Sequence, residues 1–332
     1  MRLPVPVLFL ALPLTLVLTL VAVNPARLLA GSSNAPRLFA PDVISGAADD
    51  MSPAFTPDGK TVYFSRGNDS GAMILVSHLV NGRWSEPAIV PFSGKWNDLE
   101  PAMAPDGSFL VFASNRPADG GTKPIDGNFN GKVFPAQGGN LWRVDRSGTG
   151  WGEPKRLPDT INADTATFSP SIVSDGSLYF MRPAKTNGRF ALYRSQYRDG
   201  AYEAAVAIGT GDDTTEDVDP AVAPDENFIV YSSNHPDRHD SKRLMIAFRD
   251  KGRWGTAIDL GDEVNEKGSN IEARLGPDHT TLYFSTNTVP PITFPSSKEQ
   301  AQRALEQMKV WADGRENIWC VSLDPWLEKR NE

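Results

Sequence analysis

Short apolar runs alternate with polar turns along most of the chain, and one phrase recurs five times. Its first copy reads SPAFTPDGKTVYFS, in which an apolar segment, a Pro-Asp-Gly turn and a β-branched and aromatic run follow one another. Pro presets φ, Asp caps the local backbone and Gly accepts a positive φ, so the phrase predicts a strand, a turn and a strand. The anchoring aspartates of the five copies are Asp58, Asp106, Asp175, Asp225 and Asp278.

Each copy places an aromatic residue shortly after its aspartate, in a run that is almost wholly apolar. Such runs are typical of strands that are covered on both faces. The aromatic residues are Phe64, Phe112, Phe180, Tyr231 and Phe284. Four copies also have a proline before the turn, at Pro53, Pro101, Pro170 and Pro220, whereas the fifth has Ala273.

A third apolar run follows every phrase, and a fourth short run follows the aromatic residues Trp84, Trp151, Tyr202 and Trp254. Four strands per repeat, at a spacing of about 50 residues, is the pattern of a β-propeller blade. We expect the aromatic residues of the third-strand hairpins, with Trp326 in the last copy, to pack in the core. The last copy lacks a fourth run before the chain ends.

The missing strand has a candidate at the other end of the chain. Residues 36–53 can be aligned with residues 154–170, which hold the fourth strand of the second copy and its continuation. We therefore predict an all-β fold: a single propeller of five four-stranded blades, with six blades as the alternative, closed by an N-terminal strand. Closure removes the free inner edge that would otherwise recruit other chains.

The phrase and its downstream Gly-x-Trp resemble the PD40, or WD40-like, β-propeller repeat. The resemblance covers nearly all of residues 36–326 and places the chain in the TolB-like propeller superfamily. It implies an exported bacterial protein, but it is specific for the fold rather than for a function. The TolB propeller resembles a six-bladed ring with a separate N-terminal domain, whereas this chain shows five repeats and no room for that domain.

The N-terminus differs from the rest of the chain. Residues 3–23 carry no charge and follow Met1 and Arg2, so residues 1–30 are predicted to be a secretory signal peptide or an uncleaved anchor. Residues 327–332 are predicted to be a charged tail. We expect a monomeric periplasmic or secreted protein, whose only membrane contact would be an uncleaved leader.

Composition limits the partners. The chain has 33 basic and 41 acidic residues, and a field of this sign repels phosphate backbones, which argues against nucleic acid. The one cysteine, Cys320, cannot form an intrachain disulfide and lies in an apolar run, where we expect a buried thiol.

Two long insertions separate the second and third strands of the second and fifth copies. They are residues 116–139 and 286–316, and in the latter Ala304, Leu305, Met308 and Trp311 recur at helical spacing. Strand order places both insertions on one face of the ring, and we expect them over the channel mouth. Long loops on a rigid scaffold are where binding usually resides.

Carboxylates precede the innermost strands and should reach the same face. The candidate binding residues are Asp50, Asp98, Glu100, Asp164, Asp217, Asp219 and Glu272. One interpretation is a divalent-cation site or a dock for a basic group of a partner. The other is that each carboxylate accepts hydrogen bonds from its own blade and fixes the local turn.

A second candidate metal site is the sequence HPDRHD. His235, Asp237, His239 and Asp240 could together hold Zn²⁺ or Mn²⁺, although alternating charges in an exposed loop are usually only solvated. No nucleophile elbow, zinc-protease pair, phosphate loop or dinucleotide fingerprint occurs in the sequence. We therefore assign no catalytic residues.

Two functions remain open. The first is an exported, non-enzymatic binding or scaffold propeller that engages a protein or a cell-envelope component through its loop-rich face. The alternative is a glycan-active hydrolase or lyase that uses the carboxylates at the channel mouth, a hypothesis that rests on analogy between folds.

Overall fold

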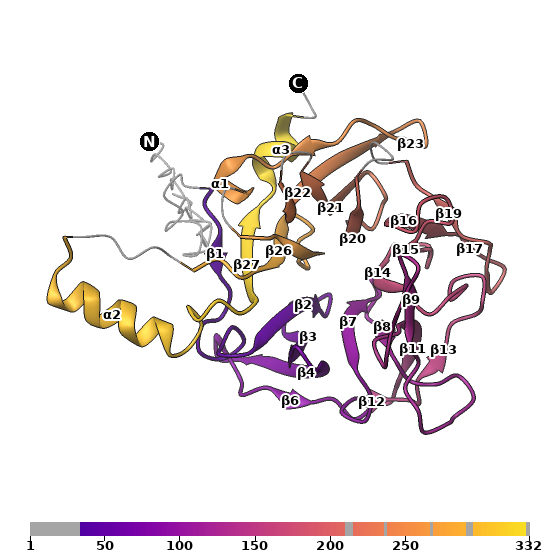
Figure 1. Cartoon of the computed structure of the whole chain (residues 1–332), viewed down its shortest axis with the longest axis horizontal. Coiled ribbons are helices and arrows are strands. Elements are labelled where there is room, and N and C mark those ends of the chain that lie inside the picture. The colour runs from indigo at the N-terminus through magenta and orange to yellow at the C-terminus, as the bar shows by residue number, and fades with distance from the viewer. Residues whose placement is uncertain (1–33, 210–214, 236–237, 266–267, 290–294, 330–332) are drawn as a thin grey trace, which may run out of the picture. The chain divides into compact units, whose positions relative to one another are not determined.

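The computed structural model describes residues 34–209, 215–235, 238–265, 268–289 and 295–329, and it describes no side chains for 235–240. These residues form a β-propeller of five antiparallel sheets (Figure 1), as the repeats predict. The predicted leader lies outside the described residues. None of the described helices is long and apolar enough to cross a membrane.

Each sheet, or blade, runs from an innermost strand to an outer strand, and the blades are numbered I to V along the chain. The innermost strands of blades I to V are β2 (Asp49–Phe55), β7 (Asp98–Met103), β14 (Phe168–Ile172), β20 (Asp217–Val222) and β25 (Ile271–Leu275). The second strands are β3 (Thr61–Asn68), β8 (Phe109–Ser114), β15 (Leu178–Pro183), β21 (Phe228–His235) and β26 (Thr281–Thr286).

The third strands are β4 (Gly71–Val80), β11 (Asn140–Ser147), β16 (Phe190–Ser195), β22 (Arg238–Asp250) and β27 (Asn317–Ser322). The outer strands are β6 (Ala88–Ile89), β13 (Lys155–Arg156), β19 (Val206–Ala207), β24 (Ile258–Asp259) and β1 (Arg37–Leu38). Hairpin extensions beyond the third strands are β5 (Arg83–Trp84), β12 (Gly150–Trp151), the pair β17 (Tyr197–Arg198) and β18 (Ala201–Tyr202), and β23 (Arg253–Trp254). Helix α1 (Asp262–Asn265) follows β24, and α3 (Asp324–Lys329) follows β27.

The repeated phrase, which reads Pro-Asp-Gly in blades I and II and keeps its aspartate in all five, forms the turn between the first and second strand of every blade. In all five turns the aspartate accepts a hydrogen bond from the backbone N–H two residues further on, at distances of 2.8 to 3.2 Å. The aromatic residues that follow are almost completely buried, and they are Phe64, Phe112, Phe180, Tyr231 and Phe284. The repeated phrase therefore encodes both a turn and a core residue in each blade.

The N-terminal strand closes the ring, as predicted. Strand β1 pairs antiparallel with β27, with Arg37 opposite Cys320 and Leu38 opposite Trp319. The hydroxyl of Ser45 then donates to the carbonyl of Ile318 at 3.2 Å. In blade II, Asn162 makes the equivalent bond to the carbonyl of Leu141, so the aligned segments have the same role.

Apolar packing reinforces this closure. Phe39 contacts the rings of Phe55, Trp84 and Tyr283 at centroid distances of 5.7, 5.7 and 5.1 Å. Ile44 is fully buried in the cluster that contains these residues. The closing segment thus joins blades I and V through its side chains as well as through its backbone.

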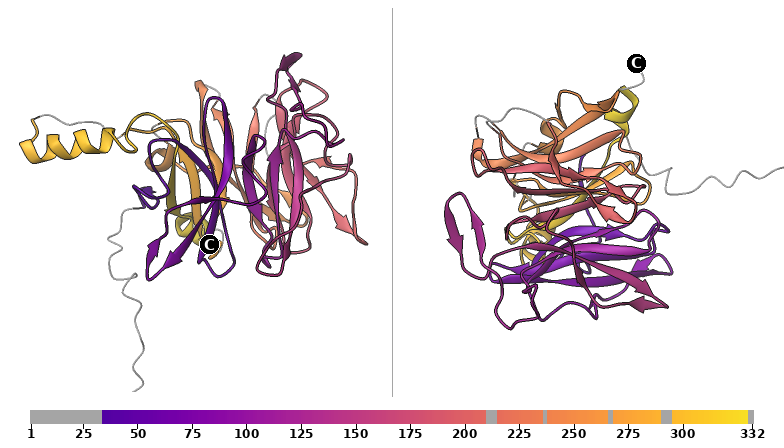
Figure 2. Two further views of the ribbon diagram at one scale, coloured as in Figure 1. Left: turned by 90° about the horizontal axis from the view of Figure 1, so that it is seen from below. Right: turned by 90° about the vertical axis from the view of Figure 1, so that its right-hand side faces the viewer.

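The two insertions leave blades II and V at the same end of the sheets, between second and third strands. The first contains the hairpin of β9 (Gly127–Phe129) and β10 (Lys132–Phe134), and the second contains α2 (Lys298–Met308). Helix α2 contains Ala304, Leu305 and Met308, whose helical spacing predicted it, and Ser297 caps it with a capping box. Figure 1 shows α2 beside the ring, and Figure 2 shows the hairpin extending beyond the sheets. The expectation that α2 covers the channel mouth is therefore wrong.

Candidate functional site

The innermost strands bring one residue from each blade to a common level of the central channel. These residues interrupt the strand register with a β-bulge and adopt positive φ values of 51° to 58°. They are Ser52, Glu100, Ser169, Asp219 and Glu272. Backbone strain of this kind, in residues other than glycine, persists only where the surrounding contacts hold it. The register of the repeats thus places three of the predicted carboxylates together.

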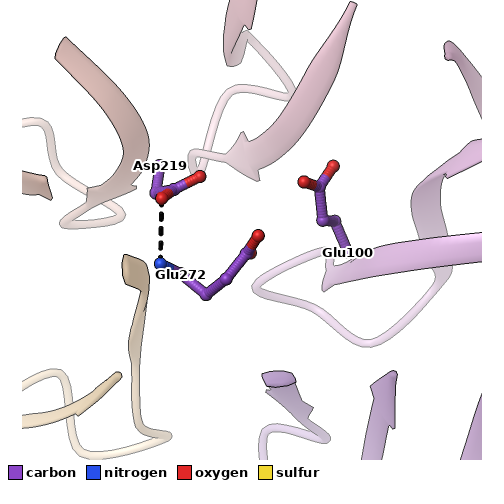
Figure 3. Close-up of side chains that lie close together, drawn as sticks. All are labelled: Glu100, Asp219 and Glu272. Atoms are coloured by element: carbon purple, nitrogen blue, oxygen red, sulfur yellow. Dashed lines mark hydrogen bonds between the residues drawn. The ribbon is translucent and has the colours of Figure 1, made fainter. Parts of the chain in front are cut away.

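Figure 3 shows the three carboxylates, Glu100, Asp219 and Glu272, which come from three different blades. Each offers an oxygen within 4.8 Å of the others. They are almost fully buried, with relative exposures of 4, 3 and 8% respectively. Oxygen ligands at this spacing have the chemistry to hold a divalent cation.

Hydrogen bonds to neighbouring blades already engage this cluster. Glu100 accepts from the backbone N–H of Ser169 at 2.7 Å, and Asp219 accepts from the backbone N–H of Glu272 at 2.9 Å. Glu272 accepts from the hydroxyl of Ser52. The cluster therefore joins the blades to one another around the axis.

The side chain of Arg274 brings a positive charge to the carboxylate cluster. The buried guanidinium of Arg274 is 3.2 Å from the Glu272 carboxylate and also donates to the hydroxyl of Ser169. The sequence interpretation missed Arg274, Ser52 and Ser169, although all three lie at or next to the proline position of the repeated phrase. Their equivalence appears only when the five copies are aligned.

Burial controls the protonation of the cluster. It raises the pKa of Glu272 to about 7, and the nearby Asp219 carboxylate adds to the increase. It also raises the pKa of Glu100 well above its usual value, with repulsion from Glu272 and Asp219 as further causes. The two glutamates thus hold protons at pH values where exposed glutamates are ionised.

Three other predicted carboxylates make contacts within their own blades. Asp50 pairs with Arg66 at 2.6 Å, and Asp98 pairs with Arg116 at 2.6 Å. Asp217 accepts from the hydroxyl of Ser233 at 2.6 Å. These aspartates lie two residues before the bulge, and each connects the innermost strand to the second strand or to the residues that follow it. Asp50 is fully buried, which raises its pKa to about 6 despite the arginine.

The remaining sequence candidates do not join the central cluster. Asp164 accepts from the backbone N–H of Ala166 at 2.9 Å and from the hydroxyl of Thr167 at 3.3 Å, so it fixes its own loop. The proposed metal ligands His235, Asp237, His239 and Asp240 lie outside the described side chains. That metal site stays a prediction.

A cavity of about 310 Å³ lies on the axis, on the side of the Pro-Asp-Gly turns. Every blade contributes at least one proline to it, and Ser171, Arg274 and His279 are its polar members. The other lining residues include Pro57, Pro105, Pro224 and Pro277. This cavity follows from the repeats themselves, and it lies at the opposite end of the sheets from the two insertions.

A smaller cavity of about 150 Å³ lies between blades IV and V, at the insertion end. Phe284 and Trp319 form its aromatic lining, and Asn270, Thr286, Thr288 and Glu263 form most of its polar lining. Trp311, at the end of the second insertion, packs edge-on against Trp319 at 6.0 Å. The sequence interpretation did not identify this cavity.

Comparison with known proteins identifies the fold but no family. No family model matches the chain. The hyperosmolality-gated Ca²⁺ permeable channel 1.5 of Arabidopsis thaliana is 26% identical over 109 residues, which covers 30% of this chain and 14% of the channel. The chain therefore spans only a small part of that protein. The PD40 assignment stays a prediction.

Similar solved structures include two glycoside-cleaving enzymes and TolB. An α-L-arabinofuranosidase from Lactobacillus brevis is 11% identical with a TM-score of 0.52, over 85% of this chain and 92% of that one. A thermostable family-43 glycoside hydrolase is 12% identical with a TM-score of 0.50, over 75% and 88%. TolB from Acinetobacter baumannii is 16% identical with a TM-score of 0.47, over 83% and 55%. At these identities the similarity to the two glycoside-cleaving enzymes establishes the fold alone.

Proposed function

We propose that the protein is an exported, non-enzymatic β-propeller that binds a protein or cell-envelope component through its insertion end. The insertion end is defined by the β9–β10 hairpin, α2 and the ends of the sheets from which they leave. The observation that carries the proposal is the exposure of apolar side chains on these two insertions. Val133 on β10 is 62% exposed, and Leu305 and Met308 on α2 are 48% and 40% exposed.

Helix α2 contributes no side chain to the core of the ring. No residue of α2 is buried, so its apolar side chains are not there to stabilise the propeller. An amphipathic helix with an uncovered apolar side is a common means of docking to another protein. The leader-like N-terminus and the excess of acidic residues favour an exported protein with a protein or envelope partner over a nucleic-acid partner.

The glycan-active alternative is less compatible with the geometry. Glycosidases place their two carboxyl groups roughly 5 to 9.5 Å apart, on either side of a sugar that must reach them. Here the three carboxylates offer oxygens within 4.8 Å of one another and are nearly inaccessible. Their hydrogen bonds to neighbouring blades also leave little freedom for acid or base catalysis.

The test is capture of envelope proteins by the purified chain and by a variant in which Leu305→Glu and Met308→Glu are combined. We expect the double variant to lose most of the captured material, because charge on the helix opposes apolar docking. Val206→Glu is the control, since Val206 is also an exposed apolar residue but lies on the outer strand of blade III. Equal capture by all three proteins would contradict the proposal.

The alternative function has its own assay. The chain is incubated with a panel of envelope and plant polysaccharides, and new reducing or unsaturated ends are measured. We expect none. Ends that appear with the chain and disappear in a Glu100→Gln variant of unchanged melting temperature would establish an enzyme instead.

A further inference from the structure

Blades I, II and III each cover their buried aromatic residue with an arginine from the same chain. Arg66 lies over Phe64 at 5.4 Å, and Arg182 lies over Phe180 at 5.8 Å. In blade II, Arg116 lies over both Phe112 and Trp142, at 5.1 and 5.3 Å. A cation above an aromatic face is attracted by the ring quadrupole, most strongly where water is excluded.

Blade V lacks this arginine. The strand registers make Phe284 and Trp319 the equivalents of Phe112 and Trp142, because both pairs lie opposite each other on the second and third strands. Continuing along these strands, the sequence FSTNT of residues 284–288 aligns with FASNR of residues 112–116. Thr288 thus occupies the position of Arg116, and the 150 Å³ cavity lies against the uncovered aromatic residues.

The buried polar residues next to Arg116 in blade II and next to Thr288 in blade V also differ. In blade II the carboxylate of Asp98 accepts from Arg116. Asn270 is its equivalent in blade V, since it too lies two residues before the bulge, and its Oδ1 has no hydrogen-bond partner among the described residues although Asn270 is only 1% exposed. A buried acceptor without a donor in the described chain is open to a hydrogen bond from a group outside it.

A second buried oxygen is paired with an arginine in blade II and has no such partner among the described residues of blade V. In blade II the Oδ1 of Asn140 accepts from Arg156 at 2.8 Å. In blade V the equivalent residue is Asn317, whose buried Oδ1 also lacks a partner within the described chain, because Leu38 of the closing strand replaces Arg156. Blade V therefore lacks two arginines that blade II supplies to itself.

We propose that the cavity between blades IV and V, which we call the blade V pocket, receives an arginine side chain of a partner protein. The pocket holds about five water molecules by volume, at roughly 30 Å³ each, which suits a guanidinium and its adjoining methylenes. Phe284 and Trp319 line the pocket with aromatic rings, and Thr286 and Thr288 line it with hydroxyl groups. The carboxylate of Glu263, at the exposed rim, supplies the opposite charge.

Arginine fits this lining better than other ligands do. A guanidinium has five N–H donors and no acceptor, which matches a lining rich in oxygen acceptors. The acidic excess of the whole chain attracts a cation and opposes an anion. The inference rests on the proposed binding role of the insertion end, and it names the chemistry of the partner's contacting group.

The experiment uses the purified full chain and a short peptide, acetyl-Gly-Arg-Gly-amide, with the citrulline peptide as an uncharged control of nearly the same shape. Binding is followed through the indole N–H signal of Trp319, which is identified by its absence from a Trp319→Phe variant. We expect a saturable shift with the arginine peptide and at least about tenfold weaker binding of the citrulline peptide, given the usual strength of a desolvated cation–π contact.

Three variants make the test specific. Thr288→Arg should fill the pocket from within the chain, as Arg116 does in blade II, and weaken peptide binding at least about tenfold. Val289→Arg is the matched control, because it adds the same charge at the neighbouring exposed position without filling the pocket. Glu263→Gln, at an exposed site that does not threaten folding, should weaken binding several-fold and reduce its salt dependence.

Melting temperatures of the variants establish that each one is folded. Equal binding of the two peptides, no shift of the Trp319 signal, or equal losses in Thr288→Arg and Val289→Arg would each overturn the proposal. Because this assay needs no partner, its failure leaves capture through α2 intact. If the α2 variant loses capture but still binds the peptide, docking through α2 and arginine binding in the blade V pocket are independent of each other.

Discussion

Blades II and V share the same insertion point and the same Phe–Trp pair, but they differ in their outer strand and in their arginines. Both carry a long insertion between the second and third strands, and both have a buried Phe opposite a Trp. Blade II completes itself with its own outer strand, and Arg116 and Arg156 pair with its buried oxygens. Blade V receives its outer strand from the other end of the chain and has neither arginine.

The difference shows how a repeat fold acquires a site. The repeat ensures that each blade packs, but the contacts of an individual blade depend on a few positions that the packing does not constrain. Where Thr288 stands in place of Arg, the aromatic residues stay, and a cavity lined by Asn270, whose Oδ1 is unpaired among the described residues, takes the place of the cation. A partner protein can then supply the guanidinium that blade V lacks.

The largest expected effect comes from removing the outer strand of blade V. Deletion of residues 34–46 removes β1, Phe39, Ile44 and the Ser45 bond to Ile318. Loss of Ile44 alone should cost roughly 2 to 5 kcal/mol, as buried aliphatic residues do, and the open edge of β27 adds the risk of aggregation. Thermal unfolding and light scattering measure both effects. A monomeric truncated protein that melts with the full-length chain would refute closure by this segment.

A smaller effect is expected when blade II is made to resemble blade V. Arg156→Ala leaves Oδ1 of Asn140 without its donor and removes a bond to the carbonyl of Asn162. Leaving buried acceptors unpaired should lower the free energy of unfolding by about 2 kcal/mol. Lys155→Ala is the control, since its exposed ammonium makes only a 3.7 Å contact with Asp145 and should matter little. Equal stability of the two variants in urea unfolding would count against the comparison.

The remaining expected effect concerns pH and the glutamates that blades II and V place at equivalent positions. The pKa of Glu272 is raised from 4.5 to about 7 in the folded protein, mainly by burial. Between these values the unfolded chain releases the proton and the folded chain keeps it, so the free energy of unfolding falls as pH rises from about 4.5 to 7. Below this window both states are protonated, and above it both are ionised.

Urea unfolding at a series of pH values measures this slope. We expect Glu272→Gln to flatten it by about one proton between pH 5 and 7, because glutamine does not titrate. Glu100→Gln should flatten it too, since the pKa of Glu100 is raised by burial and by repulsion from Glu272. A wild-type protein whose stability rises over that range, with both variants unchanged, would show that the cluster is ionised in the folded state.

The sequence predicts the repeat architecture well and the sites only in part. The Pro-Asp-Gly turns, the buried aromatic residues and the closing strand each follow from local composition and from alignment of the copies. The central cluster could be predicted only as a set of carboxylates, because the bulges that bring Glu100, Asp219 and Glu272 together depend on strand pairing. Whether an acid faces its own blade or the axis is decided by a two-residue offset, as Asp217 and Asp219 illustrate.

The blade V pocket was missed for a different reason. An arginine follows the buried aromatic residue by two to four positions in blades I, II and III, and its absence from FSTNT is visible in the sequence. The absence of this arginine from blade V becomes significant only once the arginines of the other three blades are known to contact their aromatic rings. The structure supplies that knowledge through the cation–aromatic distances.

Hydrogen–deuterium exchange of the full chain with the arginine peptide tests the central claim most directly, because the acidic centre of the ring is the obvious rival site for a cation. We predict protection on peptide addition in residues 262–265, 268–271, 284–289 and 317–320, which surround the blade V pocket. Protection confined to β7 and β20, the strands that carry Glu100 and Asp219, would contradict the account and place the binding site at the centre.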